Sequence, residues 1–136
     1  MNKTIQGSLQ DFTITVLSTM LVGEPRGIGE WGFAALVEVD QHRMLVDTGA
    51  RPDTVLKNTQ ELNVDLSGVH EVVLTHSHWD HVSGLLTLRR ELMKRNPDAL
   101  TSFCTRPVRN WLLEFTSPVQ FNAFIRSTIG AGRAGF

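Results

Sequence analysis

The stretch Glu71-Val72-Val73-Leu74-Thr75-His76-Ser77-His78-Trp79-Asp80-His81 joins a short apolar run directly to three histidines and an aspartate. The run is rich in β-branched residues and follows the turn signal Ser67-Gly68, which predicts a short strand. The histidines therefore lie on a loop at the C-terminal end of this strand. Imidazoles two positions apart on such a loop can bind one cation, an arrangement that is common for Zn²⁺.

Four side chains of this motif are candidate metal ligands: His76, His78, Asp80 and His81. His76 and His78 have the spacing for one ion, and the Asp80–His81 pair can hold a second. Two neighbouring ions would share an activated water nucleophile, whereas a single ion would leave Asp80 free as a general base. Asp80 is therefore the candidate catalytic residue. The alternative is a surface loop without a ligand, but three clustered imidazoles beside a carboxylate have little structural use.

The residues before the motif predict a sheet. Residues 12–16 alternate between apolar side chains and threonine, which predicts a strand with one buried face. Residues 33–39 and 43–46 are apolar runs separated by Asp40-Gln41, which predicts a hairpin. We expect residues 12–46 to form antiparallel strands of one sheet, with these side chains on a single face: Phe33, Ala35, Val37 and Val39.

Two amphipathic segments flank the predicted strand at residues 71–75. Residues 52–62 and 82–95 each place apolar side chains at helical spacing. We expect both helices to cover the same side of the sheet. Strands and helices in this order predict a mixed α/β (α+β) layer architecture.

Composition excludes several classes of partner. The 136 residues are enough for one domain, and a net charge of −1 gives no electrostatic footprint for nucleic acid or an anionic membrane surface. No stretch is apolar enough to span a bilayer, and no secretory signal is recognisable. The single cysteine, Cys104, excludes an internal disulfide and is interpreted as a small buried residue. These features favour a cytoplasmic protein that acts on a small molecule.

The composition changes near residue 101. Residues 101–136 contain four arginines and one glutamate, a net charge of +3 against −4 for residues 1–100, and five phenylalanines. One interpretation is a divergent C-terminal helix. The other is that residues 101–136 are a divergent tail. In that case the chain is truncated, or shifted in reading frame near Thr101, and lacks the segment that would normally pack against residues 1–100.

The motif at residues 76–81 resembles the His-x-His-x-Asp-His motif of the metallo-β-lactamase superfamily. Leu45-Val46-Asp47-Thr48-Gly49 resembles the superfamily's strand-end Asp-Thr-Gly motif. The resemblance covers about residues 12–100. Within it, Trp31-Gly32-Phe33-Ala34-Ala35-Leu36-Val37-Glu38 is similar to the branch that contains methanopterin-pathway ribofuranosylaminobenzene phosphate synthase-like proteins.

This resemblance implies that residues 1–100 form the N-terminal half of an αββα sandwich with the metals at one edge. It implies one or two Zn²⁺ ions, with Mn or Fe as alternatives, and hydrolysis of an ester, thioester, amide or phosphoester by a metal-activated water. Asp47 would orient a ligand or the motif loop through hydrogen bonds. A turn or helix-entry aspartate is the alternative for Asp47.

The sequence departs from the family pattern after residue 81. Family members supply a further His, a bridging Asp and a last His from the second half of the fold, but this sequence has no His after His81 and only Asp98 as a later Asp. We therefore expect weak or absent hydrolysis. The alternative is a non-catalytic partial fold that binds metal weakly or acts as a partner subunit. Self-association through an uncovered sheet is expected in either case.

Overall fold

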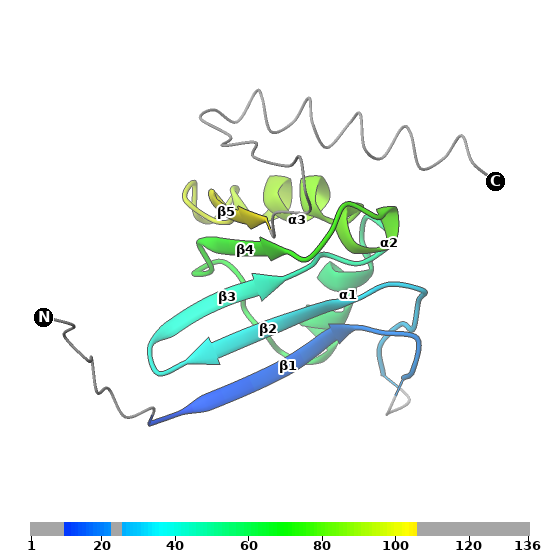
Figure 1. Cartoon of the computed structure of the whole chain (residues 1–136), viewed down its shortest axis with the longest axis horizontal. Helices are drawn as coiled ribbons and strands as arrows, with labels where there is room; N and C mark the ends of the chain where they lie inside the picture. The colour runs from blue at the N-terminus through cyan, green and yellow to red at the C-terminus, as the bar shows by residue number, and fades with distance from the viewer. Residues whose placement is uncertain (1–9, 23–25, 106–136) are drawn as a thin grey trace, which may run out of the picture.

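A single mixed sheet organises the computed structural model, which describes residues 10–22 and 26–105 (Figure 1). The order of its five strands in the sheet follows the sequence. The strands are β1 (Phe12–Ser18), β2 (Ala34–Val39), β3 (His42–Val46), β4 (Glu71–Leu74) and β5 (Ser102–Thr105). The described helices are α1 (Thr54–Glu61), α2 (Trp79–Val82) and α3 (Leu85–Leu92). The pairs β1–β2 and β2–β3 are antiparallel, whereas β3–β4 and β4–β5 are parallel.

The antiparallel sheet predicted for residues 12–46 is confirmed. β2 and β3 form the expected hairpin, with Val37 opposite Met44, and β1 adds to it with Ile14 opposite Val37. The connecting residue Asp40 has a φ of 52°, a left-handed conformation that Asp tolerates better than most residues. The mixed α/β prediction is therefore correct for the described part of the chain.

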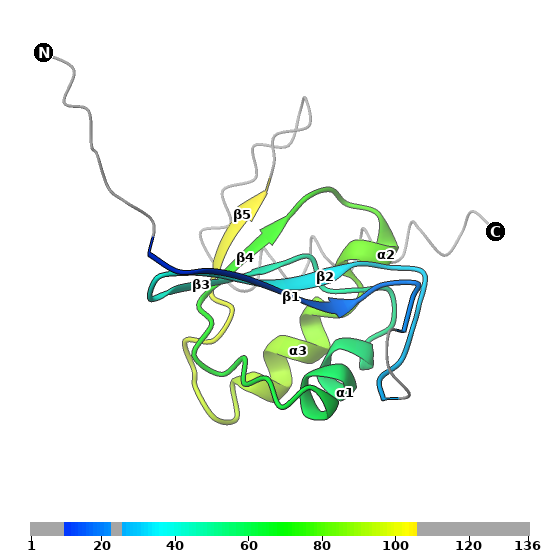
Figure 2. The ribbon, with the colours of Figure 1, turned by 90° about the horizontal axis from the view of Figure 1, so that it is seen from below.

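Both longer helices lie on one side of the sheet, as predicted (Figure 2). α1 and α3 fall within the predicted segments 52–62 and 82–95. Their apolar faces enclose a core with strand residues that point toward them. The largest fully buried side chains of this core include Leu17, Leu36, Leu45, Leu85 and Leu88. These layers are one sheet and one helix layer of the predicted sandwich.

None of the described helices covers the opposite face of the sheet, which is apolar over β1 and β2. The predicted buried face of β1 is wrong, because Phe12, Ile14 and Val16 are 55%, 53% and 45% exposed. These side chains alternate with Leu17, which points toward the helices, so they lie on the face away from α1 and α3. Their partners across the strand pair are Val39, Val37 and Ala35. These three β2 side chains therefore share one face, as predicted, and it is the face away from α1 and α3, although Ala35 itself is only 2% exposed. Alternation extends this open face to Met44 of β3.

Strand β5 and helix α2 were not predicted. Residues 102–105 pair with β4 in parallel, and the backbone N–H of Ser102 donates to the carbonyl of His70 at 3.0 Å. Cys104 lies on this strand and is exposed, which corrects its interpretation as a buried residue. The interpretations of residues 106–136 fall outside the described residues. None of the described helices is long and apolar enough to cross a membrane.

Candidate metal centre

The histidine motif lies where β4 ends and α2 begins (Figure 1). Residues 75–78 form the connecting loop, and His78 directly precedes α2 with extended dihedral angles, φ −66° and ψ 145°. Asp80 and His81 lie within α2. Because β3 and β4 are parallel, the chain leaving β3 at Asp47 lies beside this loop, and its backbone N–H donates to the carbonyl of Val73 at 2.9 Å.

The structure brings the predicted ligands together. The ring centroid of His76 lies 4.5 Å from that of His78 and 4.0 Å from that of His81. A carboxylate oxygen of Asp80 lies 3.6 Å from Nε2 of His81. The remaining described histidines contact other groups: His42 pairs with Glu71 at 3.0 Å, and Nδ1 of His70 bonds to the carbonyl of Asp98.

Asp47 links the strand end to the histidine loop. Its side chain is 1% exposed, and Oδ1 accepts from the backbone N–H of Thr75 at 2.8 Å. Oδ2 accepts from the Thr75 hydroxyl and contacts Nδ1 of His81, both at 2.7 Å. The helix-entry alternative fails, because the residue that precedes α1 is Asp53. Asp47 therefore makes the contacts required of a residue that orients a ligand, and its effect on a bound metal stays a prediction.

These hydrogen bonds set the tautomers of two imidazoles. The Thr75 hydroxyl has one proton, which it donates to Asp47, so Nδ1 of His76 at 3.0 Å must donate to the Thr75 oxygen. Nδ1 of His81 likewise donates to Asp47, because a carboxylate only accepts. Nε2 of both His76 and His81 is then left with a lone pair. A carboxylate behind an imidazole is the usual support of a metal-binding histidine.

The backbone of His81 is held as firmly as its ring. The backbone N–H of Thr48 donates to the carbonyl of His81 at 2.7 Å, and the Thr48 hydroxyl donates to the same oxygen at 3.0 Å. Thr48 and Thr75 were missed by sequence reasoning. Thr48 belongs to the Asp-Thr-Gly motif and Thr75 directly precedes the first histidine. Both lie within motifs that the sequence revealed, but the sequence did not indicate what their side chains bind.

The environment of His76 favours its neutral form. Partial burial lowers the pKa of His76 below its ordinary value, and the neighbouring His81 and His78 lower it further. The neutral imidazole is the form that binds a metal, because a proton and the ion compete for the same nitrogen. Proton competition at His76 is therefore weaker at neutral pH than for an unperturbed histidine.

The chemistry of the four candidate ligands fits a first-row divalent ion. Their positions, however, do not yet surround one ion. Imidazole and carboxylate are ligands of Zn²⁺, Mn²⁺ and Fe²⁺. Among residues 10–22 and 26–105, however, no three His, Cys, Asp or Glu side chains are placed to hold one ion together. Binding through three of them requires at least one side chain to adopt another rotamer. His78 is the exposed member of the group, so its side chain has the most room for such a change.

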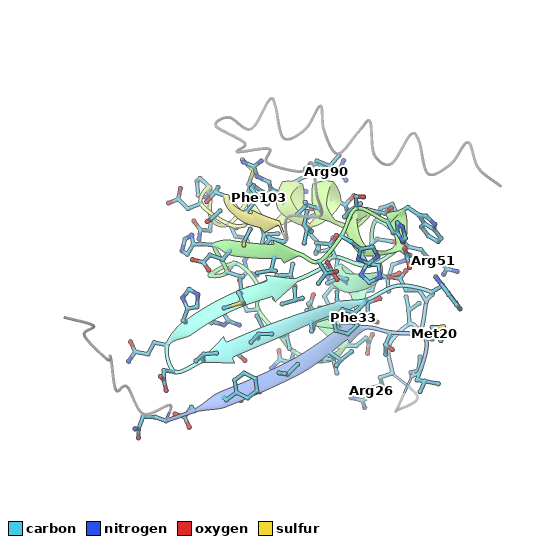
Figure 3. The ribbon with its side chains drawn as sticks, in the orientation of Figure 1. Met20, Arg26, Phe33, Arg51, Arg90 and Phe103 are labelled. Carbon is cyan, nitrogen blue, oxygen red and sulfur yellow. The ribbon has the colours of Figure 1, made fainter. Side chains whose placement is uncertain are left out.

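Other groups surround this end of the sheet. Figure 3 shows Arg51 and Met20 at the end of the molecule where α2 lies. The backbone N–H of Phe33 donates to the carbonyl of Asp80 at 3.3 Å, which ties the start of β2 to the metal loop. Glu30, which has no role in the sequence analysis, is 6% exposed.

Comparison with known proteins gives a partial match. Residues 32–95 match the family model of the metallo-beta-lactamase superfamily. A 7,8-dihydropterin-6-methyl-4-(beta-D-ribofuranosyl)-aminobenzene-5'-phosphate synthase of Methanocaldococcus jannaschii is 31% identical over 70 residues, which are 48% of this chain and 24% of that protein. An uncharacterized protein of the same organism is 39% identical over 54 residues, 40% of this chain and 21% of that protein.

Solved structures give matches of similar extent. A metal-dependent hydrolase of the beta-lactamase superfamily is 34% identical, with a TM-score of 0.47, and the match covers 61% of this chain and 32% of that one. The matches to the curated relatives extend over about a quarter of the length of those proteins, 24% and 21%.

Proposed function

Because residues 32–95 belong to the metallo-β-lactamase superfamily, we propose that this chain is a metal-dependent hydrolase of an ester, thioester, amide or phosphoester. The observation that carries the proposal is the contact of the His78 and His81 rings with that of His76, with the Asp80 carboxylate beside His81 and Nε2 of His76 and His81 without a proton. A small molecule is the proposed substrate, since a net charge of −1 gives no attraction to nucleic acid.

Each ligand has a proposed place. His76 and His78 bind the first ion, and Asp80 and His81 bind a second. With a single ion, Asp80 instead accepts a proton from the attacking water. The ion supplies Lewis acidity and a water nucleophile that is activated at neutral pH. Zn²⁺ is the proposed metal, with Mn or Fe as alternatives.

Turnover by this chain is expected to be weak. A tight Zn²⁺ site uses about three or four protein donors, whereas the sequence offers two donors to each proposed ion and no histidine after His81. Each ion then binds less tightly, and the bound water is less well placed for attack.

Hydrolysis of a generic phosphodiester and a generic ester, with added Zn²⁺ or Mn²⁺, tests this function. We expect slow turnover that requires metal and disappears in His78→Ala. His42→Ala serves as the matched control, because His42 lies away from the metal loop and pairs with Glu71. Turnover that is independent of metal, or unchanged in His78→Ala, would contradict the proposal. Rapid turnover would show that two protein donors per ion are enough, or that a further ligand takes part.

The open sheet face favours a second role, association with another copy of this chain. Strands lie about 4.8 Å apart and rise about 3.3 Å per residue, so the five-stranded face measures roughly 400 Å² per copy. Two copies packed face to face would bury about 800 Å², which is below the roughly 1,000 Å² of a stable specific interface and in the range of weak association. We therefore expect a weak dimer in which Phe12, Ile14 and Val16 are buried.

Sedimentation velocity over a range of protein concentrations tests this association. We expect the average mass of the wild-type chain to rise toward that of a dimer, and Ile14→Lys to remain a monomer, because the substitution places a charge in the apolar face. Thr13→Lys adds the same charge to the same strand but on the other face, and should associate like the wild type. A monomeric wild-type chain, or equal behaviour of the two variants, would contradict the proposed dimer.

A further inference from the structure

A buried carboxylate lies next to the loop that carries Asp47 and Thr48. Glu30 is 6% exposed, and its backbone N–H donates to the carbonyl of Thr19 at 3.0 Å. Oε1 accepts from the hydroxyl of Ser18 at 2.7 Å and from the backbone N–H of Ala50 at 2.9 Å. Oε2 accepts from the backbone N–H of Arg51 at 2.9 Å. One carboxylate therefore joins the end of β1 to the turn after β3.

The turn is shaped around this carboxylate. Gly49 has a φ of 77°, which favours glycine, and a Cβ there would lie 2.4 Å from Oε1 of Glu30. The backbone N–H of Gly49 donates to the carbonyl of Phe33 at 2.9 Å. Residues 49–51 are thus fixed from one side by Glu30 and by the start of β2.

The other side of the same turn holds His81. Thr48 binds the carbonyl of His81 through its backbone N–H and its hydroxyl, and Asp47 binds the imidazole through Oδ2. The path from Glu30 to His81 is therefore a continuous backbone segment of five residues, 47–51, with hydrogen bonds at both ends. A change in the position of Ala50 or Arg51 moves Asp47 and Thr48 with it.

We propose that Glu30 is a positioning residue for the metal centre, which fixes the turn 47–51 and thereby the direction of Nε2 of His81. This inference rests on the proposed metal-dependent function, because the position of His81 matters for an ion. Glu30 itself is buried beneath the turn, and its bonds go to Ser18, Ala50 and Arg51.

Glu30→Gln tests the inference, because the amide places an NH₂ group opposite one of the two backbone N–H donors. We expect Zn²⁺ affinity, measured by calorimetry, to fall about tenfold, the lower end of the effect of removing a group that supports a ligand. In the metal-free protein, imidazole ¹⁵N spectra should change His81 from the Nδ1–H tautomer to a mixture. Glu30→Asp, whose shorter side chain cannot reach both donors, should change both measurements in the same direction and serves where Glu30→Gln does not fold.

Two variants separate positioning from stability. Ser18→Ala removes the third bond of the same carboxylate but leaves those to the turn, and Leu92→Ala weakens the core at the far end of α3. Both should bind Zn²⁺ within about twofold of the wild type, since Ser18→Ala keeps the two bonds from Glu30 to Ala50 and Arg51, and Leu92→Ala removes no hydrogen bond of the turn. A folded Glu30→Gln with wild-type affinity and an unchanged His81 tautomer would overturn the inference. Absence of Zn²⁺ binding by the wild type would instead refute the proposed function, and the metal-free tautomer would still test Glu30.

Discussion

Replacement of Asp47 by Asn is expected to weaken Zn²⁺ binding about 10- to 100-fold and to lower the free energy of unfolding by about 2 kcal/mol. The carboxylate is buried and holds three hydrogen bonds, two with Thr75 and one with His81. The amide can accept through only one of its two atoms. With its oxygen on the Thr75 N–H, the amide turns its NH₂ group toward His81, and the ring loses its fixed tautomer and direction. In the reverse orientation the Thr75 N–H faces the NH₂ group, and the start of the metal loop loses its bond to Asp47.

Asn is the appropriate substitution because it changes the chemistry and little else. Asp47 has a φ of 56°, a left-handed conformation that Asn adopts more readily than other side chains except glycine. Asp53→Asn is the matched control: the same change on an exposed residue that pairs with Lys57. Calorimetric titration with Zn²⁺ and thermal unfolding measure both effects. Wild-type affinity in Asp47→Asn would contradict the assigned role. An equal loss of affinity in Asp53→Asn would also contradict it, because the loss would then follow from removing any negative charge.

Gly84→Ala is expected to be the most destabilising single methyl addition in the described part of the chain. A Cβ at Gly84 would lie 1.9 Å from the backbone carbonyl oxygen of Thr48, far inside van der Waals contact. The φ of Gly84 is −72°, so the cost comes from the clash and not from the backbone conformation. Relief requires α3 or the turn at Thr48 to move, and we expect a loss of about 3 kcal/mol or more.

Thermal unfolding measures this loss, because about 3 kcal/mol in a domain of this size lowers Tm by roughly 10–20 °C. Gly68→Ala is the control, since the nearest atom to its new methyl group is Nη1 of Arg43 at 3.8 Å. That variant should unfold within a few degrees of the wild type. A Gly84→Ala chain as stable as Gly68→Ala would show that the close approach of α3 to the turn is not maintained in solution.

Local patterns were enough to predict much of the fold. The alternation in residues 12–16, the apolar runs on either side of Asp40-Gln41 and the helical spacing in residues 52–62 all depend on near neighbours, and each produced the expected element. Strand β5 was missed because a strand of four residues contains too little pattern, and its pairing with β4 depends on contacts remote in sequence.

The position of strand β1 was easier to predict than which of its two faces is buried. Ile14 alternates with Thr13 and Thr15, and periodicity alone interprets the apolar side as buried. In the structure the helices pack against the side that carries Leu17, so Ile14 is exposed. Which side the helices cover is decided by tertiary packing, which a local pattern does not contain.

The residues of the candidate metal centre also fall into two groups: those that local sequence predicts and those that only the structure reveals. His76, His78, Asp80 and His81 were predicted from spacing within six residues. The structure brings them into pairwise contact, and no three of these side chains are placed to hold one ion, so their role as ligands stays a prediction. Thr75 was beside the motif, but its bond to Asp47 spans 28 positions. Glu30 binds Ala50 across 20 positions, and nothing local distinguishes it from a surface glutamate. Residues that support a ligand through the fold therefore had to be found in the structure.

Metal binding by the loop at residues 76–81 underlies every role proposed for this chain. Calorimetric titration of the metal-free chain with Zn²⁺, beside His78→Ala, tests it most directly. We predict saturable binding of at least one ion per chain, weakened about tenfold or more in His78→Ala, because each proposed ion has only two donors in this sequence. A wild-type chain that binds no Zn²⁺, or a His78→Ala chain that binds it equally well, would contradict the account.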